Sequence, residues 1–464
     1  MSLQSAIMVP HPPLIIPQVG RGQEKAIQDT IAAYRKAAAL AASQNPDTVV
    51  VITPHSALYA DYFHISSGAS AKGSLAQFHA GEVQLEVAYD AAFVAELSRR
   101  ADAAGLPAGT LGEREKKLDH AAMVPLCFLK DAFGGSIPCK VVRIGLSGLP
   151  YTDHYKLGML IGETAESLHR SIAIIASGDL SHRLKEDGPY GFAPEGPAYD
   201  ERIMDVMGRA AFGDLFHFDP DFCESAGECG HRSFVMMAGC LDGHFVKAEK
   251  LSYEGPFGVG YGVCTYLIQG TDESRRFLNA YIQEQKQALK TRKQAEDEYV
   301  RLARMTLEAY VKRGETIAMP KGLPDDMTKE RAGVFVSIKK HGQLRGCIGT
   351  ISATTESIAR EIMQNAVSAG AQDPRFDPVR ADELDDLTYS VDVLGETEDI
   401  QSPDELDVKR YGVIVTSGRR RGLLLPNLPG IDTVKEQIII ARRKANIREN
   451  ESVTLERFEV VRHQ

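Results

Sequence analysis

Residues 48–55 read TVVVITPH, a valine-rich apolar run that ends in a proline and a histidine. A short apolar run between turn-forming residues predicts a strand that is buried on both faces. The same pattern occurs three more times, as SAIMV at 5–9, CKVVRIGL at 139–146 and SIAIIAS at 171–177. Helical stretches lie between these runs, at 24–44 and 91–104. The alternation predicts an α/β domain with a mostly parallel central sheet and helices on both faces.

The overall composition is that of a soluble globular protein, with 43% hydrophobic and 25% charged residues. The 464 residues are enough for two or three domains. A net charge of -10 and the lack of a long basic run argue against a nucleic-acid partner. No apolar run is long enough to span a membrane, and the start MSLQSAIMVPHPP does not have the form of a signal peptide. We therefore expect a cytoplasmic protein without a membrane partner.

The sequence changes character after about residue 270. The segment 272–312 is charged and nearly free of glycine and proline, which predicts one or two amphipathic helices. Beyond it, GVFVSIKKHGQLRGCIGTI at 333–351 and YGVIVTSGRRRGLLLPN at 411–427 have the form of β-hairpins. We expect an α+β domain with a mixed or antiparallel sheet. The predicted limits are 1–270 for the first domain, 271–294 for a helical linker and 295–464 for the second domain.

The histidines and cysteines distinguish the two halves further. Of 13 histidines, only His341 and His463 lie beyond residue 250. The seven cysteines are scattered and form no CxxC pair, so they predict neither a disulfide framework nor a zinc site. A metal site is therefore expected among the histidines of the first half.

Three histidines follow predicted buried strands. His11 comes after AIMVP, His55 after VVVITP and His182 after IAIIASGDLS. Ligands of open α/β sheets bind outside the carboxyl ends of the strands. Three imidazoles at one edge favour a metal site over three unrelated loop residues. Imidazole suits iron, zinc and copper alike, so the pattern by itself does not name the metal.

Four motifs in the first half carry a family resemblance. MVPHPPL, ITPHSA, LDHAAMVPL and ASGDLSHRL resemble, in order, the motifs of the catalytic (LigB-type) subunits of class III extradiol ring-cleaving dioxygenases. The Memo family is similar and shares that fold. The resemblance covers about residues 5–268. It implies a non-haem Fe(2+) site, with Zn(2+) or copper as alternatives, and a catechol-like or other dihydroxy-aromatic substrate.

The resemblance also implies roles for individual residues. The iron ligands of the family fall on His11 and His55, with a carboxylate that we assign to Glu228. The catalytic acid/base falls on His182, and a second active-site histidine on His120. Asp179 either orients His182 or caps a helix.

The third metal ligand has alternatives. CGHRS at 229–233 resembles CGRHP of the Memo family, where the cysteine approaches the metal, so Cys229 is the rival of Glu228. A thiolate there would favour a softer metal or redox chemistry. Glu224 is a third candidate, although a solvated loop acid explains it better.

The second half resembles the AMMECR family over about residues 295–464. The motifs are LRGCIGT at 344–350, AGAQDPRFDPV at 369–379 and GLLLPN at 422–427; the tryptophan often found after the last motif is absent. Cys347 is either a thiol activated by Arg345 or a buried strand residue. Arg375 either binds an anion or stabilises a turn with Asp373.

The two families in one chain resemble the A-type proteins of the AmmeMemoRadiSam system. This implies a radical-SAM protein as a partner, and the family also implies pairing into a homodimer. Three functions stay open: an iron(II) extradiol-type dioxygenase, an oxygen-independent metal-dependent C–C hydrolase acting on a hydroxylated ring or cyclic ketone, and a Memo-like metal-binding redox or signalling scaffold.

Overall fold

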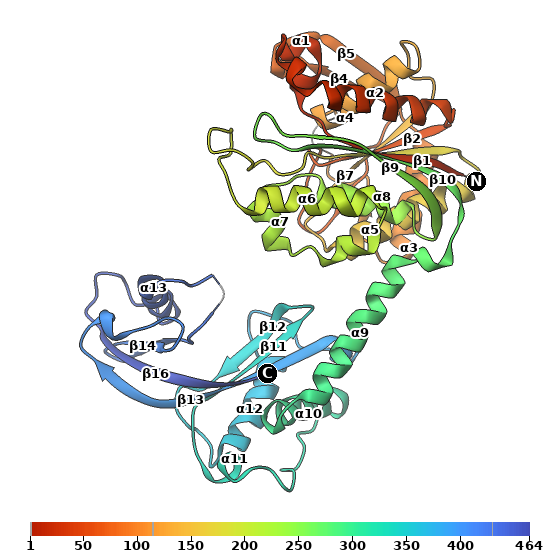
Figure 1. Ribbon diagram of the computed structural model, residues 1–464. Coiled ribbons are helices and arrows are strands. Elements are labelled where there is room, and N and C mark those ends of the chain that lie inside the picture. Colours follow the sequence, from red (N-terminus) through yellow and green to blue (C-terminus); the bar gives the residue numbers. More distant parts are fainter. Residues whose placement is uncertain (1, 114–115, 429) are drawn as a thin grey trace. The chain divides into compact units, whose positions relative to one another are not determined.

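The computed structural model describes residues 2–113, 116–428 and 430–464. The chain forms two compact units, Met1–Gln283 and Glu284–Gln464 (Figure 1). Helix α9 (Phe277–Ala295) spans the boundary between them and is followed by α10 (Glu298–Arg313), as the charged segment at 272–312 predicts. The limits assigned from the sequence to the two domains and the linker stay a prediction.

The first unit is built on a six-stranded mixed sheet, which confirms the predicted α/β class. Four neighbouring strands are parallel: β7 (Lys140–Gly145), β2 (Thr48–Thr53), β8 (Ile172–Ser177) and β1 (Leu3–Val9). Two antiparallel strands complete it beside β1, namely β10 (Tyr261–Thr271) and then β9 (His244–Glu254). In the register of β1 and β8, Val9 lies opposite Ser177, so these two strands end at the same edge.

The apolar runs form strands because both of their faces are covered. All six residues of β2 and all six of β8 are buried. Successive residues of β2 enter different cores: Val50 and Ile52 lie in one hydrophobic cluster, whereas Val49 and Val51 lie in the other. Side chains alternate between the faces of a strand, so a continuous apolar run marks a sheet with a core on each side.

Helices pack on both faces of this sheet. Figure 1 shows α2 (Gln28–Ser43) and α4 (His120–Ala132) on one face, with α5 (Tyr151–Ser167) and α8 (His231–Cys240) on the other. The remaining helices of this unit are α1 (Pro17–Gly20), α3 (Ala91–Ala103), α6 (Glu195–Gly208) and α7 (Pro220–Ala226). Two small sheets pair β3 (Phe63–His64) with β6 (Ala108–Gly109) and β4 (Ser70–Leu75) with β5 (Ala80–Ala88).

The second unit has a six-stranded antiparallel sheet, which confirms the predicted α+β class. Its strand order is β12 (Gln343–Gly349), β11 (Val334–Lys340), β13 (Leu387–Ile400), β16 (Thr454–His463), β14 (Gly412–Ser417) and β15 (Arg420–Leu424). Its further helices are α11 (Asp325–Lys329), α12 (Ile358–Ala371) and α13 (Val434–Lys444). The first predicted hairpin turns at His341 and Gly342, which both have a positive φ.

None of the helices in the described parts of the chain is long and apolar enough to cross a membrane.

Helices α5 and α8 approach each other closely through glycines. A Cβ added at Gly158 of α5 would lie 2.0 Å from the carbonyl oxygen of Met236, and one added at Gly239 of α8 would lie 2.0 Å from the carbonyl oxygen of Tyr155. The obstacle is backbone in both cases, so neither contact could be relieved by a side-chain rotation. The close pair fixes the position of α8, whose start follows the predicted ligands Glu228 and Cys229.

The substitution Gly158→Ala should therefore lower the free energy of unfolding by about 1–3 kcal/mol, the usual cost of overpacking. Gly162→Ala on the same helix is the matched control. There the added Cβ would meet the Cys240 carbonyl oxygen at 3.6 Å, an ordinary contact, and alanine favours a helix by up to about 1 kcal/mol. Urea unfolding of the two variants measures both effects. Equal stabilities would contradict the close helix packing.

Candidate metal centre

The carboxyl edge of the parallel strands gathers four histidines. His11 lies two residues beyond β1, His55 two residues beyond β2 and His182 five residues beyond β8. His120 is the first residue of α4. Because the strands run parallel and in register, their following loops meet at one place. The sheet, rather than the sequence spacing, brings these side chains together.

Three of the imidazoles form a compact group. The Nε2 atoms of His11 and His55 are 3.1 Å apart. The rings of His55 and His120 stack with their centroids 4.5 Å apart, and His11 meets His120 edge-on at 5.4 Å. One ring nitrogen from each of the three lies within 4.8 Å of the other two, a spacing at which all three could hold one metal ion. His11 is buried, His120 half-buried and His55 exposed.

His182 lies beside this group and faces an aromatic ring. Its imidazole stacks on Tyr190, with 5.1 Å between centroids. Its Nε2 atom is buried and has no hydrogen-bond partner among the described residues. Burial, with the charge of His55 as the second cause, lowers the pKa of His182 to about 4. The His182 ring is therefore neutral at neutral pH, and its Nε2 is not engaged by another described residue.

Burial also keeps the other rings neutral. It lowers the pKa of His11 well below its ordinary value, with His55, His120 and His182 adding to the effect. It lowers the pKa of His120 to about 4, with His55 as the second cause, and lowers that of His55 against the opposing charge of Asp119. Metals bind neutral imidazole, so these rings need not lose a proton first. The donor set fits a metal ion that accepts nitrogen ligands.

His11 is held by neighbours on both sides of the ring. Its backbone N–H donates to Asp179 Oδ1 at 2.7 Å, and its Nδ1 lies 3.0 Å from Ser177 Oγ. Its Nε2 lies 3.6 Å from Cys229 Sγ and 3.9 Å from Asp179 Oδ2. The ring orientation thus follows from the loop after β8 and from the segment before α8.

The structure gives Asp179 a different partner from the predicted one. Its carboxylate binds the backbone of His11, and its own N–H donates to Cys229 Sγ at 3.3 Å. The reason is the β1–β8 register, which sets His11 and Asp179 the same two residues beyond Val9 and Ser177. Burial raises the pKa of the Asp179 carboxyl to about 7. The orienting role toward His182 stays a prediction.

Glu228 and Cys229 point to different places. The Glu228 carboxylate accepts a hydrogen bond from the His231 N–H at 2.5 Å, at the start of α8, whereas Cys229 Sγ faces His11. Among the described residues, the group able to share a metal is His11, His55 and His120, without Glu228. Burial raises the pKa of the Cys229 thiol well above its ordinary value. The assignment of Glu228 as the third ligand therefore stays a prediction from resemblance, and Cys229 lies nearer to His11.

Sequence reasoning did not find the residues that hold these side chains. Asp119 accepts hydrogen bonds from Ala122 N–H at 3.0 Å, which caps α4, and from Thr53 Oγ1 at 2.7 Å, at the end of β2. Asp119 also lies 3.6 Å from Arg143, which is 2% exposed. One carboxylate thus joins the supports of His55 and His120. A lone arginine in the apolar strand KVVRIG was the available signal for a buried ion pair.

A cavity of about 310 Å³ opens beside His55. Its lining combines apolar, aromatic and charged side chains, contributed by His55, Ser56, Ala57, Leu58, Tyr59, Lys117, Asp119 and Arg143. The volume is that of a small-molecule site, and the mixed lining is typical of one.

The candidate residues of the second unit form ion pairs and hydrogen bonds with neighbouring side chains and backbone. Arg345 pairs with Glu383 at 2.9 Å. Arg375 pairs with Asp373 at 2.6 Å and donates to the Cys347 carbonyl oxygen at 2.9 Å. Cys347 is half-buried, and its Sγ accepts from Ser337 Oγ at 3.2 Å. These contacts fit the turn-stabilising alternative for Arg375.

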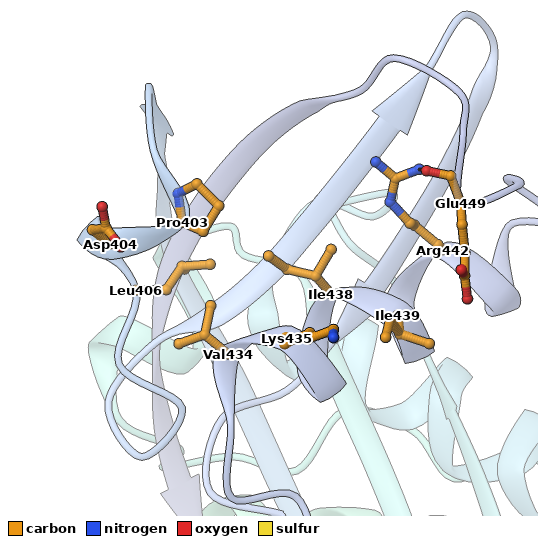
Figure 2. A pocket seen from close by; sticks show the side chains of 9 residues that line it. All are labelled: Pro403, Asp404, Leu406, Val434, Lys435, Ile438, Ile439, Arg442 and Glu449. Atoms are coloured by element: carbon orange, nitrogen blue, oxygen red, sulfur yellow. Dashed lines mark hydrogen bonds between the residues drawn. The ribbon is translucent and has the colours of Figure 1, made fainter.

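A larger hollow in the second unit, of about 670 Å³, lies between α13 and the segment 403–406. Figure 2 shows Leu406, Val434 and Ile438 beside one another, with Arg442 and Glu449 to one side. Its lining contains none of the residues predicted for a site.

Glu228 gives the stability of the chain a testable pH dependence. Burial raises the pKa of its carboxyl from the ordinary 4.5 to about 7. The folded chain therefore keeps a proton that the unfolded chain loses between these values, so this group lowers stability as pH rises through the window. Glu228→Gln removes the loss, and its free energy of unfolding relative to the parent should grow by up to about 3 kcal/mol from pH 4.5 to 7. Urea unfolding of the metal-free chain at both ends of the window measures this. The exposed Glu224→Gln is the control, and parallel curves for Glu228→Gln and the parent would contradict the burial of this acid.

Two protein-family models match the chain. The model described as the catalytic LigB subunit of aromatic ring-opening dioxygenase matches residues 5–264, and the AMMECR1 model matches residues 300–463. Among solved structures, the chain is similar to the uncharacterized protein PH0010 from Pyrococcus horikoshii (32% identical, TM-score 0.33, covering 35% of this chain and 88% of that one). It is also similar to the uncharacterized protein JW3007 from Escherichia coli K12 (15% identical, TM-score 0.37, covering 57% and 99%).

One curated relative matches both halves of the chain, and another matches about a third of it. Protein CA_C1420 of Clostridium acetobutylicum is 41% identical over 471 aligned residues, which cover 100% of this chain and 99% of that protein. A protein of Thermotoga maritima is 48% identical over 170 residues, which cover 36% of this chain and 98% of that protein. The chain therefore belongs to the family of the catalytic LigB subunits of aromatic ring-opening dioxygenases through residues 5–264, joined in one polypeptide to an AMMECR1 domain at residues 300–463.

Proposed function

We propose that the first unit is a non-haem Fe(2+)-dependent extradiol-type ring-cleaving dioxygenase that acts on a catechol-like or other dihydroxy-aromatic substrate. The observation that carries the proposal is the convergence of His11, His55, His120 and His182 at one edge of the sheet. Membership in the LigB family supports the reaction class. The overall reaction adds both atoms of O2 across one ring C–C bond, next to the two hydroxyls, and opens the ring.

His11 and His55 would hold the metal, with a third ligand from the candidates below. Two or three protein ligands on one side leave room for substrate and O2. When bound, ferrous iron would supply the one-electron chemistry that allows O2 to react with an aromatic diol. Every other task falls to side chains of the protein.

His182 is the group placed to accept a substrate proton. Its Nε2 has no hydrogen-bond partner among the described residues, and its ring stacks on Tyr190. A catechol must lose a proton to become electron-rich, and a neutral imidazole within reach accepts it. His120 stacks on His55 and would stabilise the negative charge that remains on the substrate oxygens. The cavity beside His55 would position the ring.

Metal binding and oxygen uptake test the proposal together. The protein, stripped of metal and reloaded with Fe(2+) without oxygen, should consume O2 when one member of a catechol panel is added. His11→Ala and His55→Ala should each lose the bound metal, because each removes one of a small number of ligands. His169→Ala is a control outside the group. Full metal retention in both variants contradicts the proposal. Turnover without O2, or with Zn(2+) in place of Fe(2+), would instead select the C–C hydrolase.

A second function is favoured by one observation, the 3.6 Å distance from Cys229 Sγ to His11 Nε2. A cysteine beside two histidines suits copper, zinc or a redox role rather than oxygen activation. This second candidate is a Memo-like metal-binding redox or signalling scaffold. In it, the metal would have to displace the thiol proton, because burial raises the pKa of Cys229.

Paired substitutions distinguish the two functions. Cys229→Ser and Glu228→Gln each keep size and polarity while weakening one candidate ligand. If Cys229 is the third ligand, Cys229→Ser should lower the affinity for Cu(+) or Zn(2+) at least tenfold, and Glu228→Gln should change it little. If Glu228 is the ligand, the order reverses and Fe(2+) affinity falls. Metal titration against a competing chelator measures both. No change in either variant would exclude both residues and leave His120 as the third ligand.

The radical-SAM partner, the homodimer and the cytoplasmic location remain predictions from family resemblance and composition.

A further inference from the structure

A proline in helix α4 leaves one carbonyl without its helical donor. In an α-helix the N–H of residue i donates to the carbonyl of residue i−4. Pro125 lies inside α4 and has no N–H, so the carbonyl of Ala121 cannot receive that bond. The Ser177 hydroxyl, at the end of β8, donates to this carbonyl at 2.7 Å. A side chain at the end of a sheet strand therefore supplies the hydrogen bond that the Ala121 carbonyl lacks within the helix.

This bond uses the only proton of the Ser177 hydroxyl. A serine hydroxyl donates one hydrogen bond and accepts up to two. Ser177 is fully buried, and its Oγ lies 3.0 Å from Nδ1 of His11. With its proton directed to Ala121, the hydroxyl can only accept from His11. The proton of the neutral His11 ring must then sit on Nδ1.

The opposite ring nitrogen is consequently bare. Nε2 of His11 lies 3.1 Å from Nε2 of His55 and 3.6 Å from Cys229 Sγ. Two Nε2 atoms at that distance cannot both carry a proton. Because the contact with Ser177 places the ring proton of His11 on Nδ1, it is Nε2 of His11 that lacks a proton. Nε2 of His11 thus presents a lone pair to the centre of the three-histidine group.

We propose that Pro125 and Ser177 are positioning residues that fix the Nδ1–H tautomer of His11, so that its Nε2 is ready to bind a metal. The inference deepens the proposed function and rests on His11 being a ligand there. The Ala121 carbonyl, left open by Pro125, accepts the proton of the Ser177 hydroxyl. The Ser177 oxygen then accepts from Nδ1–H of His11. Hydrogen bonds from the distal nitrogen of a ligating histidine fix its tautomer in this way and typically contribute 10- to 100-fold to metal affinity.

The tautomer can be measured without a metal. Nitrogen-15 chemical shifts of the full chain, labelled only at histidine, distinguish protonated from bare ring nitrogens, and His11→Gln identifies the signals of His11. The metal-free parent should show a protonated Nδ1 and a bare Nε2. A protonated Nε2 in the parent overturns the proposal, whatever the protein does with metal.

Three variants separate the contributions. Ser177→Ala should produce a mixture of His11 tautomers and weaken Zn(2+) binding about 10- to 100-fold in a chelator competition. Ser181→Ala is the matched control, because the buried Ser181 hydroxyl also donates to a backbone carbonyl, that of Ala226 at 2.7 Å, away from His11. It should leave the His11 tautomer unchanged. Equal tautomers in the parent and Ser177→Ala overturn the role of Ser177.

Pro125→Ala tests whether the missing N–H of Pro125 directs the Ser177 hydroxyl. Alanine has the higher helix propensity, so α4 should still form. The new N–H competes for the Ala121 carbonyl, so the Ser177 proton is partly released toward His11. The Nδ1–H population should fall, by less than in Ser177→Ala. An unchanged population overturns the role of Pro125. If the tautomers behave as stated but no metal binds the parent, the proposed function fails and the tautomer assignment stands.

Discussion

Parallel pairing of β1, β2 and β8 is the constraint on which the rest of the first unit depends. The hydrogen-bonded register ends β1 at Val9 beside the end of β8 at Ser177, with β2 on the other side of β8. Each of the four histidines of the candidate centre follows one of these strand ends by two to five residues or begins α4. A shift of one residue in any pair would turn alternate side chains to the opposite face and separate the imidazoles.

Burial of ionisable groups gives the centre its chemical character. Desolvation disfavours charge, so it lowers the pKa of the imidazoles and raises the pKa of the Asp179 and Glu228 carboxyls to about 7. The result is a set of uncharged donors in a weakly polar surrounding. Such donors bind a cation without first breaking strong ion pairs. Asp119 has a different neighbour, because its carboxylate lies 3.6 Å from the guanidinium of the buried Arg143.

The supports of His11, His55 and His120 are shared rather than separate. Asp119 joins the end of β2 to the cap of α4, and Ser177 joins the end of β8 to a carbonyl that Pro125 leaves open in the same helix. The start of helix α4 is thus hydrogen-bonded to the strand ends that precede His55 and lie beside His11, and it carries His120 itself. A polar network of this kind positions side chains more narrowly than apolar packing alone, because each bond has a preferred direction.

The sequence by itself determined the strands and the placement of histidines just beyond the ends of three of them. Valine-rich runs could only be buried strands, and the hairpin at His341-Gly342 was readable from its alternation and its turn residues. It did not determine which groups meet. Glu228 and Cys229 are adjacent in sequence, yet Glu228 accepts from the first N–H of α8 and Cys229 faces His11. The partners of Asp179, the link from Pro125 to His11 and the buried Arg143 pair all join residues far apart in the chain. Only tertiary structure decides such contacts, because hydrogen bonds depend on distances of a few ångströms that no local pattern encodes.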